Sequence, residues 1–158
     1  MRTFSHFALA IFLSTAIAMP QANTDEQEIT NFRLNMDNLA KFSNVSKTMM
    51  KMLHDDPSLN KRFNESQQNK TIAQTTENIE KNYPAVAAAI HGAGLSPHEY
   101  VVMTGTIIGT TMAVGMKKQG MIKTIPPSVS PENAAFVEQN YEKINSLMQS
   151  LMQAQNDR

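Results

Sequence analysis

The sequence predicts an all-α fold: a small helical bundle with one central apolar helix rich in Gly and Thr, preceded by a signal peptide. Apolar residues recur at intervals of three and four along residues 39–53 and 134–151, which is the spacing of one helix face. Ser-Pro pairs at 96–97 and 130–131 are each followed by a glutamate, a pattern typical of helix starts. Residues 100–116 carry no formal charge, so a helix there belongs in the middle of the bundle.

Residues 1–18 are predicted to be a secretory signal peptide. Arg2 supplies a positive charge, residues 7–18 form an apolar core, and Ala16 and Ala18 place small residues before a cleavage site. We expect cleavage after Ala18, with Ala22 as the second choice, and therefore an exported protein that is periplasmic or secreted. An uncleaved membrane anchor is the competing interpretation, although the apolar segment is short for a spanning helix.

The rest of the chain is predicted to be a flexible leader over residues 19–31 and a single helical domain over residues 32–155, because residues 23–30 are mostly polar. The absence of cysteine excludes disulfides, thiolate metal sites and cysteine nucleophiles. Lys plus Arg and Asp plus Glu both number 14, so removal of Arg2 leaves 13 against 14 and a net charge of −1. Without a basic surface, nucleic acid is not an expected partner.

The first helix is expected over residues 36–54. Apolar and polar side chains alternate just before it, in residues 32–36, which indicates a short extended segment. The helix ends at Asp55-Asp56-Pro57, because proline disfavours helix in the residue before it and aspartate favours turns. Its apolar positions are Leu39, Phe42, Val45, Met49 and Leu53.

Two short helices and one longer helix are expected next. Pro57 opens a short helix over residues 57–63, and Pro84 opens another over residues 84–91 that Gly92 and Gly94 end. Between them, a helix is predicted over residues 66–82 from spacings of four, three and four at Ile72, Thr76, Ile79 and Tyr83.

The apolar helix that follows carries a full set of start signals. Ser96 can cap it, Pro97 fits its first turn, and Glu99 completes a capping box three residues after the cap. Gly120 is expected to end it, which gives a helix of about 22 residues and about 33 Å.

The last part of the chain is predicted to be an extended connector and one long helix. Residues 122–129 contain two adjacent prolines, which favour extended backbone. Ser130 then starts a helix whose apolar residues are spaced by three and four, at Ala134, Val137, Tyr141, Ile144, Met148 and Leu151.

Four parts of the sequence carry a resemblance to a protein group, and one of them is the Gly-, Ala- and Thr-rich segment that follows residues 94–100. GLSPHEY (94–100), PPSVSPENAAFV (126–137) and FRLNMDNLAKF (32–42) resemble parts of small exported bacterial proteins without an assigned function. The resemblance covers most of the chain after the signal peptide and implies an exported helical protein. Its motifs are helix starts and packing positions, so it implies no catalytic residue.

The uncharged segment at 100–116 could also be interpreted as a membrane span, and it contains a GxxxG pattern at Gly105 and Gly109. Four threonines and three glycines make it only mildly hydrophobic, however. We expect a buried helix whose small residues let its neighbours approach closely, and no membrane span in the mature chain.

The favoured function is non-catalytic binding in the cell envelope, to a protein or a small apolar ligand, by a monomer or weak dimer. Eleven of the twelve methionines follow Met1, and methionine lines adaptable binding grooves. The proposed apolar groove is lined by Met103, Ile107, Met112 and Met116.

Two other functions remain alternatives. Methionine thioethers bind Cu(I), so a Met/His copper or other metal carrier is one of them, although no ligand pair of the HExxH type occurs. A hydrolase using His98 and Glu99 is the other, but the sequence contains no GxSxG motif and no phosphate-binding loop. Methionine is also common in protein cores, and His54, His91 and His98 lie at expected helix ends. We therefore assign no catalytic residue, metal ligand or cofactor.

Overall fold

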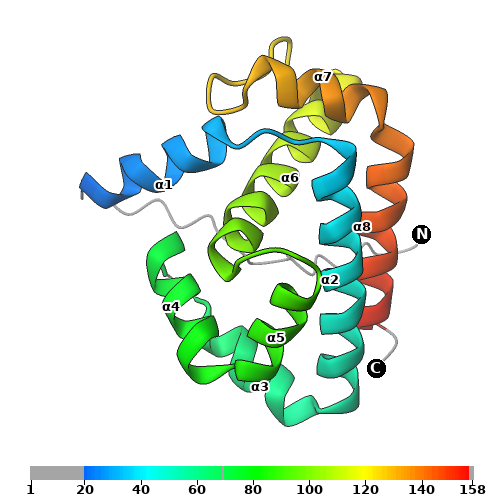
Figure 1. The fold of residues 1–158 in the computed structure, drawn as a ribbon. Helices are drawn as coiled ribbons and strands as arrows, with labels where there is room; N and C mark the ends of the chain where they lie inside the picture. Colours follow the sequence, from blue (N-terminus) through cyan, green and yellow to red (C-terminus); the bar gives the residue numbers. More distant parts are fainter. Residues whose placement is uncertain (1–19, 69, 157–158) are drawn as a thin grey trace.

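A computed structural model describes residues 20–68 and 70–156 of the 158-residue chain (Figure 1). These residues form eight helices and no strand, which confirms the all-α bundle. The predicted signal peptide, residues 1–18, lies outside the described residues.

Helix α1 (Pro20–Asn31) occupies the segment that the sequence suggested to be a flexible leader. Its sequence alone has no apolar stripe, so the polar composition was misleading. The helix is instead held by contacts with other elements: Ile29 packs on Gly105 of a later helix, and the Asp25 carboxylate accepts a 3.0 Å hydrogen bond from the Ile72 amide. The leader is therefore corrected to a docked helix.

Helices α2 (Met36–Asp55) and α3 (Pro57–Ser66) follow a non-helical segment at residues 32–35, of which Asn35 has extended backbone. Asn35 and Asn38 form a reciprocal capping box at the start of α2. Asp56 ends α2 and accepts hydrogen bonds from the first amides of α3, so one residue serves both helix ends.

Helices α4 (Ile72–Asn82) and α5 (Pro84–Gly92) form the next pair. The expected start of α4 at residue 66 is corrected to residue 72, because α3 extends to Ser66 and Thr71 caps α4 with Gln74. After α5 the chain turns at Gly94, whose φ of 76° is a conformation that favours glycine.

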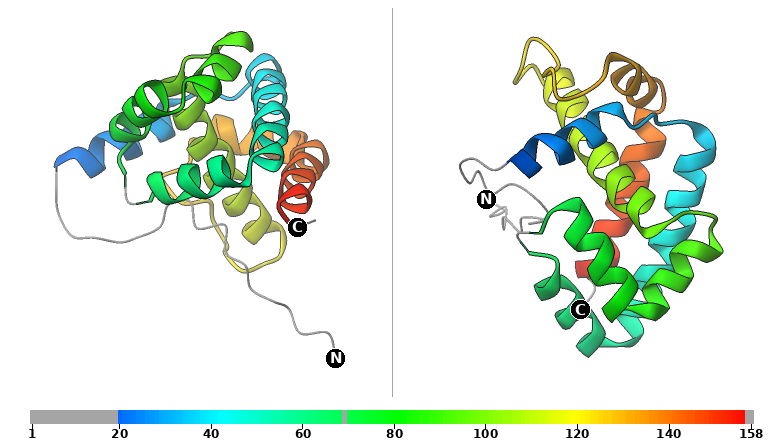
Figure 2. Two further views of the ribbon diagram at one scale, coloured as in Figure 1. Left: turned by 90° about the horizontal axis from the view of Figure 1, so that it is seen from below. Right: turned by 60° about the vertical axis from the view of Figure 1, so that its left-hand side comes forward.

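Helix α6 (Pro97–Lys118) begins at the predicted capping box of Ser96 and Glu99, and Gly120 follows its end with a φ of 72°. It packs against α1, α2, α4, α5, α7 and α8. In Figure 2 its N-terminal half lies beside α4 and α5, and its C-terminal end leads into the connector of residues 119–130. Within the described residues, the length and hydropathy that a membrane crossing requires are not found in any helix.

Helices α7 (Pro131–Gln139) and α8 (Tyr141–Asn156) replace the single long helix that the sequence predicted. The break lies at Asn140, whose side-chain amide donates a 2.9 Å hydrogen bond to the Phe136 carbonyl. The Asn140 backbone N–H donates to the same carbonyl at 3.1 Å, and the φ of −112° at this residue lies outside the helical range, so α7 ends there. The apolar seam still faces the core, because Val137 and Ile144 on either side of the break are fully buried.

The core lies where α6 meets α2, α4, α5, α7 and α8, and α2 lies beside α8 (Figure 1). The Phe42 and Tyr100 rings stack between α2 and α6 with centroids 5.7 Å apart. Its largest fully buried apolar side chains are Val45, Ile79, Val86, Ile90, Met103, Ile107, Val114, Val137 and Ile144.

Candidate binding surface

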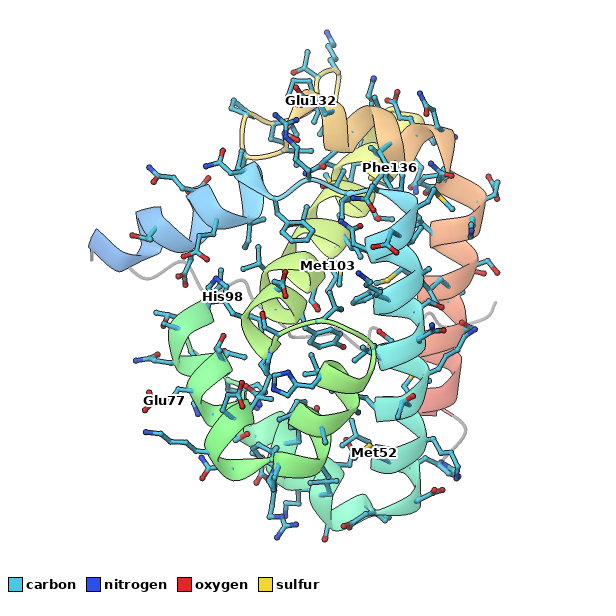
Figure 3. The ribbon with its side chains drawn as sticks, in the orientation of Figure 1. Met52, Glu77, His98, Met103, Glu132 and Phe136 are labelled. Atoms are coloured by element: carbon cyan, nitrogen blue, oxygen red, sulfur yellow. The ribbon has the colours of Figure 1, made fainter. Side chains whose placement is uncertain are left out.

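The four residues of the predicted groove do not share a surface. The side chains of Met103 and Ile107 are 0% exposed, whereas Met112 is 54% and Met116 is 38% exposed. Nine residues separate Met103 from Met112, which places them about 180° apart around a helix of 3.6 residues per turn. The groove is therefore corrected: Met103, labelled in Figure 3, and Ile107 belong to the core, and only the other two residues reach solvent.

A different arrangement places Met112 and Met116 on one side of α6 with Gly105 and Gly109. A Cβ atom on Gly105 would lie 2.9 Å from Ile29 Cδ1, so α1 packs closely on this part of the helix. A Cβ atom on Gly109 would have nothing within 4 Å. Helix α1 thus covers the first glycine of the GxxxG pattern and leaves the second one open.

The docking of α1 sets the edge of this surface. The Thr106 hydroxyl donates a 3.0 Å hydrogen bond to the Ile29 carbonyl, and His98 Nε2 lies 2.8 Å from a carboxylate oxygen of Glu28. Figure 3 shows His98 at the N-terminal end of α6, below α1. We call Gly109, Met112 and Met116, which continue beyond α1 along the same side of the helix, the α6 open face.

The α6 open face holds two of the four large hydrophobic side chains that are exposed among the described residues. A third, Met121, follows directly after α6 and is 66% exposed; the fourth, Met36, lies at the start of α2. By contrast, Met49 and Met103 are buried in the core. Exposed apolar side chains therefore gather at the C-terminal end of α6, as at many interaction surfaces.

Lysines border this end of α6. Lys117 Nζ forms a 2.9 Å ion pair with Glu138 of α7. Lys118 Nζ lies 4.4 Å from the centre of the Tyr141 ring, a cation–π contact. Both contacts hold the lysine side chains toward α7 and α8, and the methionines remain on the other side of the helix.

The histidine and carboxylate groups considered as sites have structural partners. Glu99 accepts hydrogen bonds from the backbone amide and the hydroxyl of Ser96, and these bonds hold the pKa of its carboxyl below the usual value. His98 contacts Glu28 of α1, whereas His91 lies 3.6 Å from Glu80 of α4. The two histidines thus serve different helix contacts and do not form one site.

The described part of the chain has no group of three or more His, Asp or Glu side chains placed to hold a metal ion. Its surface includes two hollows. The larger, of about 500 Å³, is lined by Lys117, Ile125, Pro126, Pro127, Val129, Pro131, Ala134, Ala135 and Glu138. The smaller, of about 260 Å³, is lined by Glu28, Asn31, Phe32, His98, Glu99 and Val102. Most residues of the larger hollow are exposed, unlike the enclosed pockets that bury small ligands.

Asn133 has a structural role that the sequence analysis missed. Its side-chain carbonyl accepts a 2.9 Å hydrogen bond from the Leu34 amide, and its side-chain amide donates a 2.6 Å bond to the Phe32 carbonyl. Arg33 adds a 2.6 Å ion pair with Glu132. These partners lie about one hundred positions apart, so no local pattern could have indicated the contact. Two of the segments behind the family resemblance therefore dock on each other.

Comparisons with protein-family models, with curated proteins and with solved structures found no match for the chain. The resemblance to small exported bacterial proteins therefore stays a prediction, and the candidate surface stands on its own geometry.

Proposed function

We propose that the chain is an exported, non-catalytic binding protein that engages a partner protein through the α6 open face. The observation that carries this proposal is the exposure of Met112 and Met116 where the cover of α1 ends. Methionine is flexible and polarizable, so exposed methionines suit a surface that adapts to a partner.

A protein suits this surface better than a small ligand does. The α6 open face lies on the outside of a helix. None of its three residues lines either of the two hollows. Small ligands are usually held in concave sites with a few converging polar groups. A helix or a flat apolar patch of a partner can instead lie across Gly109, where nothing occupies the space of a side chain.

The export part of the proposal rests on the charge, apolar core and small residues of residues 1–18. Cleavage after Ala18 is the expected processing, and cleavage after Ala22 is the second choice.

A copper carrier is the second candidate, and one observation favours it. Met112 and Met116 lie one helical turn apart and are both exposed, so two thioethers face the same solvent. Competition between the protein and a Cu(I) chelator tests this candidate. Binding that is lost in Met112→Leu/Met116→Leu would support it, since leucine keeps the apolar surface and removes the sulfur; no binding by the parent would exclude it.

In vivo photo-crosslinking tests the binding proposal. A photoreactive amino acid replaces Met112 in the protein expressed in its own host, and the matched control carries it at Met36, which is 45% exposed on α2. We expect a discrete crosslinked species from position 112 and none of the same mass from position 36. Equal labelling from the two positions, or none from position 112, would contradict the proposal.

A further inference from the structure

All of the large hydrophobic side chains that are exposed in the described part of the chain are methionines. They are Met36, Met112, Met116 and Met121; the leucines, isoleucines, valines and phenylalanines described with them are buried or half-buried. A surface that required only apolar contact could use leucine or isoleucine equally well. The use of methionine at every one of these positions points to the chemistry of its sulfur, which is easily oxidised and has no competing cysteine in this chain.

Three of these methionines gather at the C-terminal end of α6. Met112 and Met116 lie about one helical turn apart on the same side of the helix. Beyond them, the Gly120 amide donates a 3.0 Å hydrogen bond to the Lys117 carbonyl, and the Met121 amide donates a 2.9 Å bond to the Met116 carbonyl. This glycine-dependent helix ending turns the chain back, so Met121 returns to the last turn of the helix.

We infer that Met112, Met116 and Met121 form a site of reversible oxidation by hydrogen peroxide. The thioether sulfur attacks one peroxide oxygen; the O–O bond breaks, an S–O bond forms, and the departing hydroxide takes the proton of the transferred oxygen. The sulfur loses two electrons and the peroxide gains them, so the products are a sulfoxide and water. Two thiols of a sulfoxide reductase reverse the change, because they form a disulfide and release the oxygen as water.

The fold keeps these three sulfurs apart from those whose oxidation would damage it. Met103 is 0% and Met49 is 6% exposed, so peroxide in solvent does not reach either sulfur while the bundle stays closed. A sulfoxide is polar, and it disrupts packing where the methionine is buried. Oxidation at the end of α6 therefore changes the surface of the molecule and leaves its core intact.

Oxidation makes the α6 open face polar. The sulfoxide oxygens on Met112 and Met116 accept hydrogen bonds from water, and a partner that covers them must displace that water at a cost. We therefore expect peroxide to release a partner from this face and a reductase to restore its binding. This consequence rests on the proposed function, whereas the oxidation site itself does not.

Peptide mass spectrometry of the natively folded protein in hydrogen peroxide measures the oxidation rate of each methionine. Met112, Met116 and Met121 should gain one oxygen atom at least about tenfold faster than Met49 and Met103. The circular dichroism of the helices should be unchanged when only the three fast sites have reacted. Equal rates at exposed and buried methionines, or loss of helical signal at that stage, would overturn the inference.

Retention on a phenyl column then measures how apolar the surface is, without a partner. Peroxide should make the parent elute earlier, and reductases for both sulfoxide stereoisomers should restore its retention. Met112→Leu/Met116→Leu/Met121→Leu removes the three sulfurs and keeps apolar side chains, so it should lose most of the peroxide-induced shift. Met36→Leu, the matched control at a methionine that is 45% exposed on α2, should keep the shift. Equal shifts in the two variants, or a shift that reductases do not reverse, would contradict the site.

Photo-crosslinking from position 112 separates this inference from the proposed function. Met116 and Met121 remain in that variant, so peroxide given to the host cells should weaken the crosslinked species, and adding Met116→Leu/Met121→Leu should preserve it. A crosslink that persists while both methionines are oxidised would leave the binding function standing and overturn its control by oxidation. No crosslink, with the oxidation rates as expected, would reject the binding function and leave the oxidation site standing.

Discussion

At the scale of single residues, buried polar groups specify how distant segments meet. Asn133 is 1% exposed, and its amide group satisfies both an N–H and a C=O of the extended segment before α2. An apolar side chain of similar size would bury just as well but would leave those backbone groups without partners. The docking of this segment on α7 therefore depends on hydrogen bonds more than on burial.

Asn133→Ala should lower the free energy of unfolding by about 2–4 kcal/mol, because two backbone groups at residues 32–34 lose their partner. Chemical denaturation of the variant and the parent measures this difference. Gln139→Ala, an exposed change in the same helix, is the matched control and should shift stability by less than about 0.5 kcal/mol. Equal effects of the two changes would show that Asn133 is not a docking residue.

Glu99 gives a pH-dependent prediction. The hydrogen bonds from Ser96 hold the pKa of Glu99 below its ordinary value of 4.5. A lowered carboxyl pKa in the folded state contributes stability above the ordinary pKa, and this contribution is lost as the pH falls through the lowered value. Glu99→Gln should therefore unfold more easily than the parent at pH 7, by about 0.5–1 kcal/mol for a weakened cap.

Thermal unfolding at a series of pH values measures this effect, and the difference between parent and variant should shrink in acid. Glu142→Gln removes a charge from the first turn of α8 and controls for the helix dipole. A difference that stays constant from pH 7 to well below pH 4.5 would contradict the role of the Glu99 carboxylate.

At the scale of elements, the two glycines of the GxxxG pattern have different surroundings. Gly105 lies under Ile29 of α1, and Gly109 lies in open space. The same residue type on the same helix therefore serves close packing at one position and leaves a notch at the other.

Gly105→Ala should loosen α1, because the new methyl group would lie 2.9 Å from Ile29 Cδ1 and would displace the side chain. Gly109→Ala meets nothing and should stabilise the protein by about 0.5–1 kcal/mol through helix propensity. Hydrogen exchange of the amides of α1, measured at low protein concentration, separates the two variants: only Gly105→Ala should exchange faster than the parent. Faster exchange in both variants would show that α1 does not depend on this contact.

The helices could be predicted where their signals are local. The capping box at Ser96, the proline starts and the three-four spacing predicted α6 and most of α2, because each signal lies within a few residues of its effect. Helix α1 was missed because it is stabilised by contacts with α4 and α6. The predicted groove is wrong because Met103 and Ile107 lie on the opposite side of the helix from Met112 and Met116, although all four side chains are apolar. The α6 open face also depends on where α1 ends, which a single sequence does not reveal.

At the scale of the whole molecule, α6 is surrounded by the six helices that contact it, which are α1, α2, α4, α5, α7 and α8. The α6 open face, in the C-terminal half of the helix, stays exposed to solvent. A single exposed methionine is ordinary, but Met112, which is 54% exposed, and Met116 lie exposed on the same side of α6. We propose that this exposure serves binding outside the cytoplasm.

Native mass spectrometry of the protein recovered from its host's extracytoplasmic fraction tests this claim most directly. We expect a chain that begins at Met19 and carries a bound protein, with Met112→Glu/Met116→Glu losing that protein and Met36→Glu keeping it. A chain that retains residues 1–18 would contradict export, and a complex that survives the double substitution would contradict binding through the α6 open face.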